Sequence, residues 1–177
     1  EAKEPIGAGI GPHLQVREVL RVLQQHEKRP SDLEKKALHL CAVIIELVGM
    51  AKWKAAYEIA YKQLVSGKAW AKMQKIIIAQ RGKNPNIYSE DLLLWTHKKE
   101  ITAKKDGIIK EIDLQEVNLI ARTLWSPIEE EVGIYFAKKL GNKVKKWDIL
   151  FTLYANDQSK MDMALEVLKE KEMITIG

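Results

Sequence analysis

Apolar residues recur at helical spacing through the first half of the chain. The i, i+3, i+4, i+7 pattern of one buried face predicts a first helix that ends near Gln25, carried by Val16, Val19, Leu20 and Leu23. A longer helix is predicted from residue 31 to Gly49, with a buried face formed by Leu33, Ala37, Leu40, Cys41, Ile44 and Val48. Two more helices are expected over about residues 52–65 and 69–81. The first half is therefore predicted to be an all-α layer.

The expected helix ends carry their own signals. Ser31-Asp-Leu-Glu34 is typical of a capping box, in which the serine accepts from a backbone N–H and the glutamate reaches back to the start of the helix. Gly49, Gly67 and Gly82 stand where the three following helices should stop, because glycine adopts a left-handed conformation at little cost.

The second half changes to a period of two. Residues 99–103 are predicted to form a strand with Ile101 and Ala103 facing inward. A second strand is expected through Val132, Ile134 and Phe136. Asp113-Leu-Gln-Glu116 is predicted to cap a helix with Leu114, Val117, Ala121 and Leu124 along one side. A last helix is predicted over about 158–170, with Met161, Ala164, Leu165 and Leu168 on one side. Met173 to Ile176 is expected to close the chain as an edge strand.

The stretch from Lys143 to Tyr154 organises this second half. It follows a Gly141-Asn142 turn, and Ile149, Phe151 and Leu153 repeat at period two. We expect it to form a hairpin and strand that pair with residues 107–114. It would be the core of a small barrel-like C-terminal domain.

These patterns predict an α+β fold in two parts. Residues 1–83 are expected to form a mostly helical domain and residues 98–177 an α+β C-terminal domain. The turn-rich segment 84–97 is expected to link them.

Composition narrows the class of protein. An apolar fraction of 46% excludes a disordered tail, and the 30% of charged residues are mixed in sign, with a net charge of +5. This favours a solvated surface over a basic nucleic-acid stripe. The single Cys41 lies in an apolar run and is expected to be buried, so no disulfide framework arises. Without a signal peptide or an apolar run of about 18 to 20 residues, we expect a cytoplasmic protein.

No catalytic constellation is apparent within the chain. The histidines, at positions 13, 26, 39 and 97, have no HxxxH or HExxH spacing. None of the serines occupies a nucleophile elbow, and Glu129-Glu-Glu131 is typical of a solvated acidic run. Pro5-Ile-Gly-Ala-Gly-Ile-Gly-Pro12 fits two interpretations: a phosphate cradle before a helix N-terminus, or a tight strand-to-helix turn without a ligand.

Three segments in order resemble one enzyme family. Glu4 to Leu20 is similar to the pattern P-[IL]-G-x-x-[IV]-G-x-x-L-x-[VA]-[RK]-[ED]-V-L of the thymidine phosphorylase and archaeal AMP phosphorylase family. Ser66-Gly-Lys-Ala-Trp-Ala-Lys-Met73 with Ala79-Gln-Arg-Gly82 is similar to its SGKAxxKF…AQGG run. Residues 106–113, 132–134 and 140–146 resemble its C-terminal GxVxxID…AGIxLxxKxGDxVKxGD domain, whose fold is a hammerhead or barrel-sandwich hybrid.

The resemblance implies phosphorolysis. Such enzymes cleave the N-glycosidic bond of a nucleoside or nucleotide with phosphate and release the free base and a sugar 1-phosphate. The chain begins at Glu1 instead of methionine, and we expect it to be the C-terminal third of such an enzyme, inactive alone, with its intact parent a homodimer or larger homo-oligomer. We prefer AMP, or another nucleoside 5′-monophosphate, to thymidine as substrate, because the loop looks closer to the archaeal group.

The family's catalytic residues precede the opening loop, so none is assigned here. The resemblance implies one site within the chain: a potassium ion bound by the carbonyls of Ile6 and Gly9 and by Glu18. No other cofactor is expected, and neither nucleic acid nor a membrane is expected as a partner.

The chain departs from the family pattern at three tryptophans, and two other functions fit the sequence as well. Trp53, Trp125 and Trp147 stand at apparent glycine positions, where a turn with positive φ would strain tryptophan by roughly 1 to 3 kcal/mol. The C-terminal domain also resembles a lipoyl or biotinyl carrier, although no lysine has the Met-Lys setting of a modified residue. A basic nucleic-acid-binding module is the third interpretation, and it predicts salt-sensitive binding.

Overall fold

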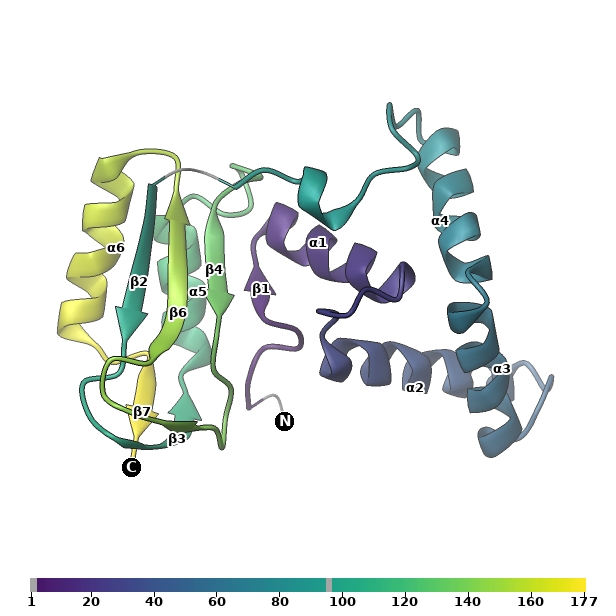
Figure 1. Cartoon of the computed structure of the whole chain (residues 1–177), viewed down its shortest axis with the longest axis horizontal. Helices are drawn as coiled ribbons and strands as arrows, with labels where there is room; N and C mark the ends of the chain where they lie inside the picture. Colours follow the sequence, from purple (N-terminus) through teal and green to yellow (C-terminus); the bar gives the residue numbers. More distant parts are fainter. Residues whose placement is uncertain (1–2, 95–96) are drawn as a thin grey trace. The chain divides into compact units, whose positions relative to one another are not determined.

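The computed structural model describes residues 3–94 and 97–177. Its elements follow the predicted order closely (Figure 1). The helices are α1 (Pro12–Leu23), α2 (Ser31–Leu47), α3 (Trp53–Val65), α4 (Lys68–Ala79), a 3-10 turn η1 (Ser89–Asp91), α5 (Leu114–Thr123) and α6 (Gln158–Glu170). The strands are β1 (Gly9–Ile10), β2 (His97–Thr102), β3 (Gly107–Ile112), β4 (Gly133–Phe136), β5 (Lys143–Val144), β6 (Ile149–Ala155) and β7 (Ile174–Ile176). The predicted α+β class is confirmed.

The chain forms two compact units, and one of them is built from two separate stretches of the sequence. One unit consists of residues 1–16 together with 92–177, and the other of residues 17–91, so the boundary falls within α1. The opening residues belong to the first unit because β1 pairs with β4. These units differ from the predicted ranges 1–83, 84–97 and 98–177, of which residues 95–96 lie outside the described part. The domain ranges stay a prediction.

Two antiparallel sheets build the first unit. The larger sheet has the order β1-β4-β6-β2, and the smaller has the order β5-β3-β7. β6 lies between β4 and β2, with Phe151 opposite both Phe136 and Ile101. The predicted pairing of residues 107–114 with 143–154 holds only for β5, where Gly107 faces Val144. Within the described residues these strands close no barrel.

The core of the first unit lies between the strands and the helices α5 and α6. β6 contributes side chains from both of its faces, since Leu150, Phe151, Thr152 and Leu153 are all buried. α5 and α6 run along the strands in Figure 1 and bury Val117, Ile120, Met161 and Ala164 in the same cluster. Ile149, which belongs to the period-two apolar repeat, is the first residue of β6 and is 37% exposed.

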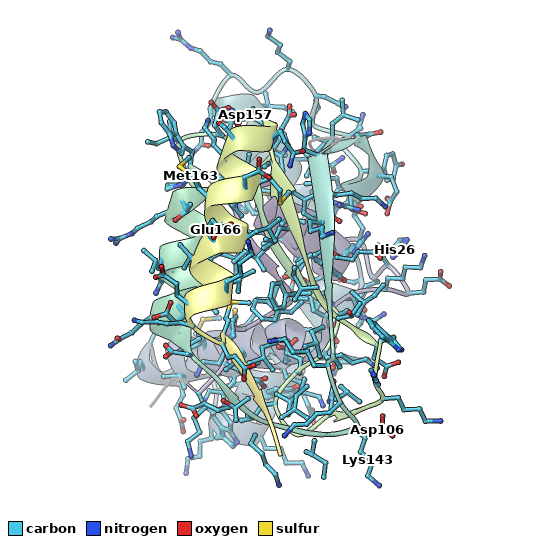
Figure 2. The ribbon with its side chains drawn as sticks, turned by 90° about the vertical axis from the view of Figure 1, so that its left-hand side faces the viewer. His26, Asp106, Lys143, Asp157, Met163 and Glu166 are labelled. Carbon is cyan, nitrogen blue, oxygen red and sulfur yellow. The ribbon has the colours of Figure 1, made fainter. Side chains whose placement is uncertain are left out.

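Polar caps fix both helices of this unit. The Oδ1 atom of Asp113 accepts from the backbone N–H groups of Gln115 at 2.8 Å and Glu116 at 3.2 Å, as the sequence predicted for this helix start. Asp157 caps α6 by accepting from the Lys160 N–H at 3.0 Å, and hydrogen bonds from Ser159 and Lys160 lower its pKa. Figure 2 shows Asp157 at one end of α6 and Glu166 farther along the same helix.

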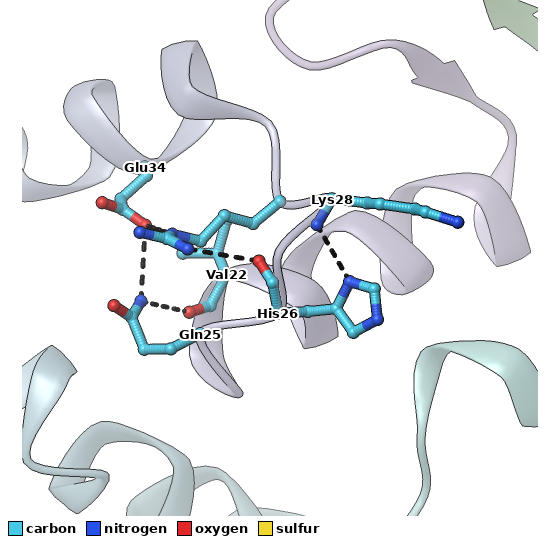
Figure 3. Close-up of polar contacts among 6 residues, drawn as sticks. Val22, Gln25, His26, Lys28 and Glu34 are labelled. Atoms are coloured by element: carbon cyan, nitrogen blue, oxygen red, sulfur yellow. Dashed lines mark hydrogen bonds and ion pairs between the residues drawn. The ribbon is translucent and has the colours of Figure 1, made fainter.

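The second unit is a helical layer with a small core. Its buried cluster is formed by Val22, Leu38, Ala60 and Leu64, with α2 packed against α3. A polar network joins the end of α1 to the start of α2 (Figure 3). Glu34 accepts from the Arg29 side chain at 2.5 Å and from the Gln25 amide at 3.3 Å.

Two predictions for α2 are wrong. Pro30 is the N-cap residue and Ser31 is already the first residue of the helix, while Glu34 accepts from Arg29 and Gln25, so there is no capping box. The predicted buried face is also displaced. Leu38 and Ala42 are the buried residues, whereas several predicted ones are exposed: Leu40, Cys41, Ile44 and Val48.

The tryptophan turns are confirmed at two of three positions. Trp125 has φ 71° and Trp147 has φ 76°, so both side chains stand at positions that favour glycine. Trp53 instead begins α3. Among the described residues, no helix is sufficiently long and apolar to pass through a bilayer.

Candidate functional site

The glycine loop, residues 4–11, runs alongside β4 and the segment that follows it. β1 pairs antiparallel with β4, placing Gly9 opposite Tyr135 and Ile10 opposite Ile134. The Phe136 N–H donates to the Ala8 carbonyl at 2.8 Å. Beyond the loop, the His13 N–H at the start of α1 donates to the Glu130 carbonyl at 2.9 Å. Residues 9–10 of the loop thus form one edge strand of the larger sheet.

Two glycines make this close approach possible. A Cβ atom on Gly133 would lie 1.9 Å from the Ile10 carbonyl oxygen, and one on Gly11 would lie 2.2 Å from the Val132 carbonyl oxygen. Both glycines also have positive φ, 150° at Gly133 and 122° at Gly11. The two backbones therefore contact each other directly where a side chain on either would separate them.

Lys139 binds the first part of the loop. Its ammonium Nζ donates to the Pro5 carbonyl at 2.5 Å and to the Gly7 carbonyl. In the same place the Leu140 N–H donates to the Glu4 carboxylate at 2.9 Å. In all of these bonds residues 139–140 donate and the loop accepts. Each bond has one charged partner, and such charge-assisted bonds are roughly twice as strong as neutral ones.

The 139–142 turn that carries this lysine is itself fixed. The Lys139 N–H donates to Oδ1 of Asn142 at 2.9 Å, and the Asn142 N–H donates back to the Lys139 carbonyl at 3.0 Å. Gly141, with φ 79°, donates to the Ile109 carbonyl of β3 at 2.9 Å, and Ile109 donates to the Asn142 carbonyl at 3.0 Å. The lysine is therefore held by the smaller sheet while its ammonium reaches the edge of the larger one.

The adjacent Lys138 has a different partner. Its ammonium lies 3.4 Å from the Asp148 carboxylate, in the turn that precedes β6. The Lys145 N–H, which donates to Asp148 at 3.1 Å, together with Lys138, lowers the pKa of this carboxyl. The two neighbouring lysines thus serve separate contacts, one to a carboxylate and one to backbone carbonyls.

The predicted potassium ligands fall in both units. Ile6 is 54% exposed and Gly9 is buried, both in the glycine loop of the first unit. Glu18 belongs to the second unit and is 3% exposed. In residues 3–94 and 97–177, no three side chains of histidine, cysteine, aspartate or glutamate gather as a metal group. Sequence reasoning missed Lys139, because a lysine beside a glycine turn usually faces solvent and its partners lie more than 130 residues away.

A small hollow lies beside the loop. It measures about 210 Å³, below the roughly 300 Å³ at which pockets for drug-sized ligands begin. Its lining includes Gly11, Gln15, Asn118 and Arg122. The glycine loop with Lys139 is therefore the more informative feature of the first unit.

Comparisons with known proteins agree with the ordered motifs. Residues 108–175 match the pyrimidine nucleoside phosphorylase C-terminal domain. The chain is 37% identical over 172 residues to AMP phosphorylase of Methanosarcina acetivorans, covering 97% of this chain and 34% of that protein. It is 36% identical over 177 residues to AMP phosphorylase 2 of Archaeoglobus fulgidus, covering 100% and 34%. Along nearly its whole length the chain is therefore similar to proteins of the thymidine phosphorylase and AMP phosphorylase family.

A bacterial relative in this family gives the same picture. The putative thymidine phosphorylase of Rhodopseudomonas palustris is 37% identical over 169 residues, which are 96% of this chain and 32% of that protein. The chain thus spans about a third of the length of these phosphorylases. The matched C-terminal domain extends from β3 to β7, so it contains the 139–142 turn, whereas the glycine loop precedes it.

Proposed function

We propose that these 177 residues are the C-terminal third of a phosphorylase that acts on AMP or another nucleoside 5′-monophosphate. A phosphate oxygen attacks C1′ of the sugar, the bond from C1′ to the base nitrogen breaks, and the base leaves with the electron pair and takes up a proton. The products are the free base and ribose 1,5-bisphosphate. The protein's share in such a reaction is to position the phosphate and stabilise developing charge.

One observation carries this proposal above the others. The match to AMP phosphorylases covers nearly the whole chain in order, from the glycine loop to the last strand. A thymidine or pyrimidine nucleoside phosphorylase is the second candidate. It is favoured by the match of residues 108–175 to the pyrimidine nucleoside phosphorylase C-terminal domain. We also propose that the C-terminal part of the chain is related in fold to the barrel-sandwich hybrid.

The role we propose for this part of the enzyme is structural support. It carries no assigned catalytic residue, and the resemblance places the phosphate-binding and base-binding residues upstream. The 177-residue chain alone is therefore expected to be inactive, and the parent enzyme to be a homodimer or larger homo-oligomer. The first unit would hold the glycine loop in place through β4 and Lys139.

The test is phosphate-dependent release of base by the full-length protein. AMP and thymidine are each incubated with and without phosphate, and base and sugar phosphate are separated by chromatography. Adenine and ribose 1,5-bisphosphate from AMP would support the first candidate, and thymine from thymidine the second. Release from neither would refute both, and a lipoate or biotin mass on the purified protein would then favour a carrier.

A potassium ion bound by the Ile6 and Gly9 carbonyls and by Glu18 remains part of the proposal. Oxygen donors with one carboxylate suit a hard cation. Carbonyls alternate along a strand, so Gly9 presents its carbonyl away from β4 when Ala8 accepts from Phe136. Replacing potassium by tetramethylammonium should lower activity, and Glu18→Gln should raise the potassium concentration required. Unchanged activity in the absence of potassium would remove the ion from the proposal.

A further inference from the structure

The ammonium of Lys139 binds two carbonyls of one short loop. A lysine ammonium has three donors and no acceptor, so it suits a site built from carbonyl oxygens. The Pro5 and Gly7 carbonyls supply two of these acceptors. Gly7 is buried and has φ 72°, a left-handed conformation that glycine adopts far more readily than other residues. The loop is therefore shaped so that both carbonyls face one cation of the protein itself.

The loop and the lysine are both anchored elsewhere, which makes the contact a cross-link. The lysine backbone is held by Asn142, whose own backbone pairs with Ile109. On the other side, the loop continues into β1 and its pairing with β4. Lys139 is thus placed to fix residues 5–7, which precede the first strand pair.

We propose that Lys139 is a positioning residue that holds the glycine loop in its working shape. Its ammonium orients the Pro5–Ile6 and Gly7–Ala8 peptide groups, so that loss of the ammonium frees this part of the loop without removing any group that touches substrate. The functional part of this inference rests on the proposed phosphorylase activity. The anchoring part rests only on the contacts of Lys139.

The neighbouring lysine provides a matched control. Lys138 lies on the same turn with a similar side chain, but it pairs with Asp148 and not with the loop. Lys139→Met keeps the length and apolar stem of the side chain and removes the charge. Lys139→Arg keeps the charge with a different donor geometry. Lys138→Met removes a charge from the same turn and leaves the loop contacts in place.

Hydrogen exchange of the full-length protein, followed by mass spectrometry, tests the anchoring without any assay of activity. In Lys139→Met, exchange in a peptide covering residues 6–11 should become about 10 to 100 times faster, because two charge-assisted bonds are lost. Lys139→Arg should recover part of the protection, and Lys138→Met should match the wild type. Equal exchange in Lys139→Met and the wild type would overturn the proposal.

Kinetics of the same variants tests the functional part. We expect Lys139→Met to lower kcat by about 10- to 100-fold, as supporting residues of a site commonly do, with a smaller change in KM for phosphate. Lys139→Arg should restore part of kcat. Faster exchange with an unchanged kcat would refute the positioning role. If the wild type released no base at all, the proposed function would fail, and the exchange result would still decide whether Lys139 anchors the loop.

Discussion

Replacing Gly133 with alanine tests the close contact on which the glycine loop depends. The new Cβ would lie 1.9 Å from the Ile10 carbonyl oxygen, whereas ordinary contact begins at 3.4 Å. The loop backbone must therefore retreat by about 1.5 Å, the difference between these two distances. Such a shift breaks the pairing of Gly9 with Tyr135 and of Ile10 with Ile134.

The expected loss of stability has two parts. Forcing a methyl group into a filled space destabilises by about 1 to 3 kcal/mol, and a side chain at the φ of 150° found at Gly133 adds backbone strain of about 1 to 3 kcal/mol. The sum of roughly 2 to 6 kcal/mol is a large share of a domain stability of about 5 to 15 kcal/mol. The first unit of Gly133→Ala should unfold at a distinctly lower urea concentration.

Gly141→Ala is the matched control, because Gly141 has φ 79° but no atom within 4 Å of the added Cβ. It should suffer only the backbone strain, about 1 to 2 kcal/mol. Urea-dependent hydrogen exchange of a peptide from β6 reports the first unit alone, so the two variants can be compared directly. If Gly133→Ala were no less stable than Gly141→Ala, the inferred close contact between the backbones of the loop and β4 would be refuted.

Three further predictions concern the first unit. Asp113→Ala should destabilise the chain by about 1 kcal/mol, while Asp113→Asn should keep the cap and remain near the wild type in urea unfolding. A hydrogen bond from the Lys145 N–H and pairing with Lys138 lower the pKa of Asp148 below its ordinary 3.8. The stabilisation that this carboxylate gives the fold is therefore fully present above pH 3.8 and is lost as the pH falls through the lowered pKa. Asp148→Asn should accordingly lose less stability than the wild type when both are titrated with acid between about pH 5 and 2. Trp147 is 71% exposed with φ 76°, so Trp147→Gly should stay within about 1 kcal/mol of the wild type and Trp147→Val should be clearly less stable than Trp147→Gly; equal stability would contradict the turn.

Local signals predicted most elements because the period of apolar residues and the stop residues depend on near neighbours. The helix predicted over about 158–170 is α6, and Asp113 caps α5 as expected. The pairing between strands that are distant in the sequence could not be predicted as well. The pattern of residues 143–154 indicated a strand, but it could not show that β6 would lie between β4 and β2 while only β5 pairs with β3.

The error in α2 has a physical origin in an excess of apolar positions. The run from Leu38 to Ile45 places apolar residues on more than one face of a helix, so periodicity alone allows several buried stripes. In the structure the stripe through Leu38 and Ala42 packs against α3, where small Ala56 and Ala60 let the helices approach. The buried face of α2 therefore depends on the sizes of the residues on α3, and the apolar pattern of α2 alone contains no information about them.

The glycine loop shows how a motif and its partner together define a chemistry that the motif alone leaves open. Its spacing fitted an anion cradle, which needs several N–H groups aimed at one point, and also a plain turn. Between Pro5 and Gly7 the structure aims carbonyl oxygens at Lys139, and Pro5 has no N–H to offer an anion. This part of the loop is therefore an acceptor site for a cation. In the proposed reaction we therefore expect residues outside this part of the loop to bind the phosphate.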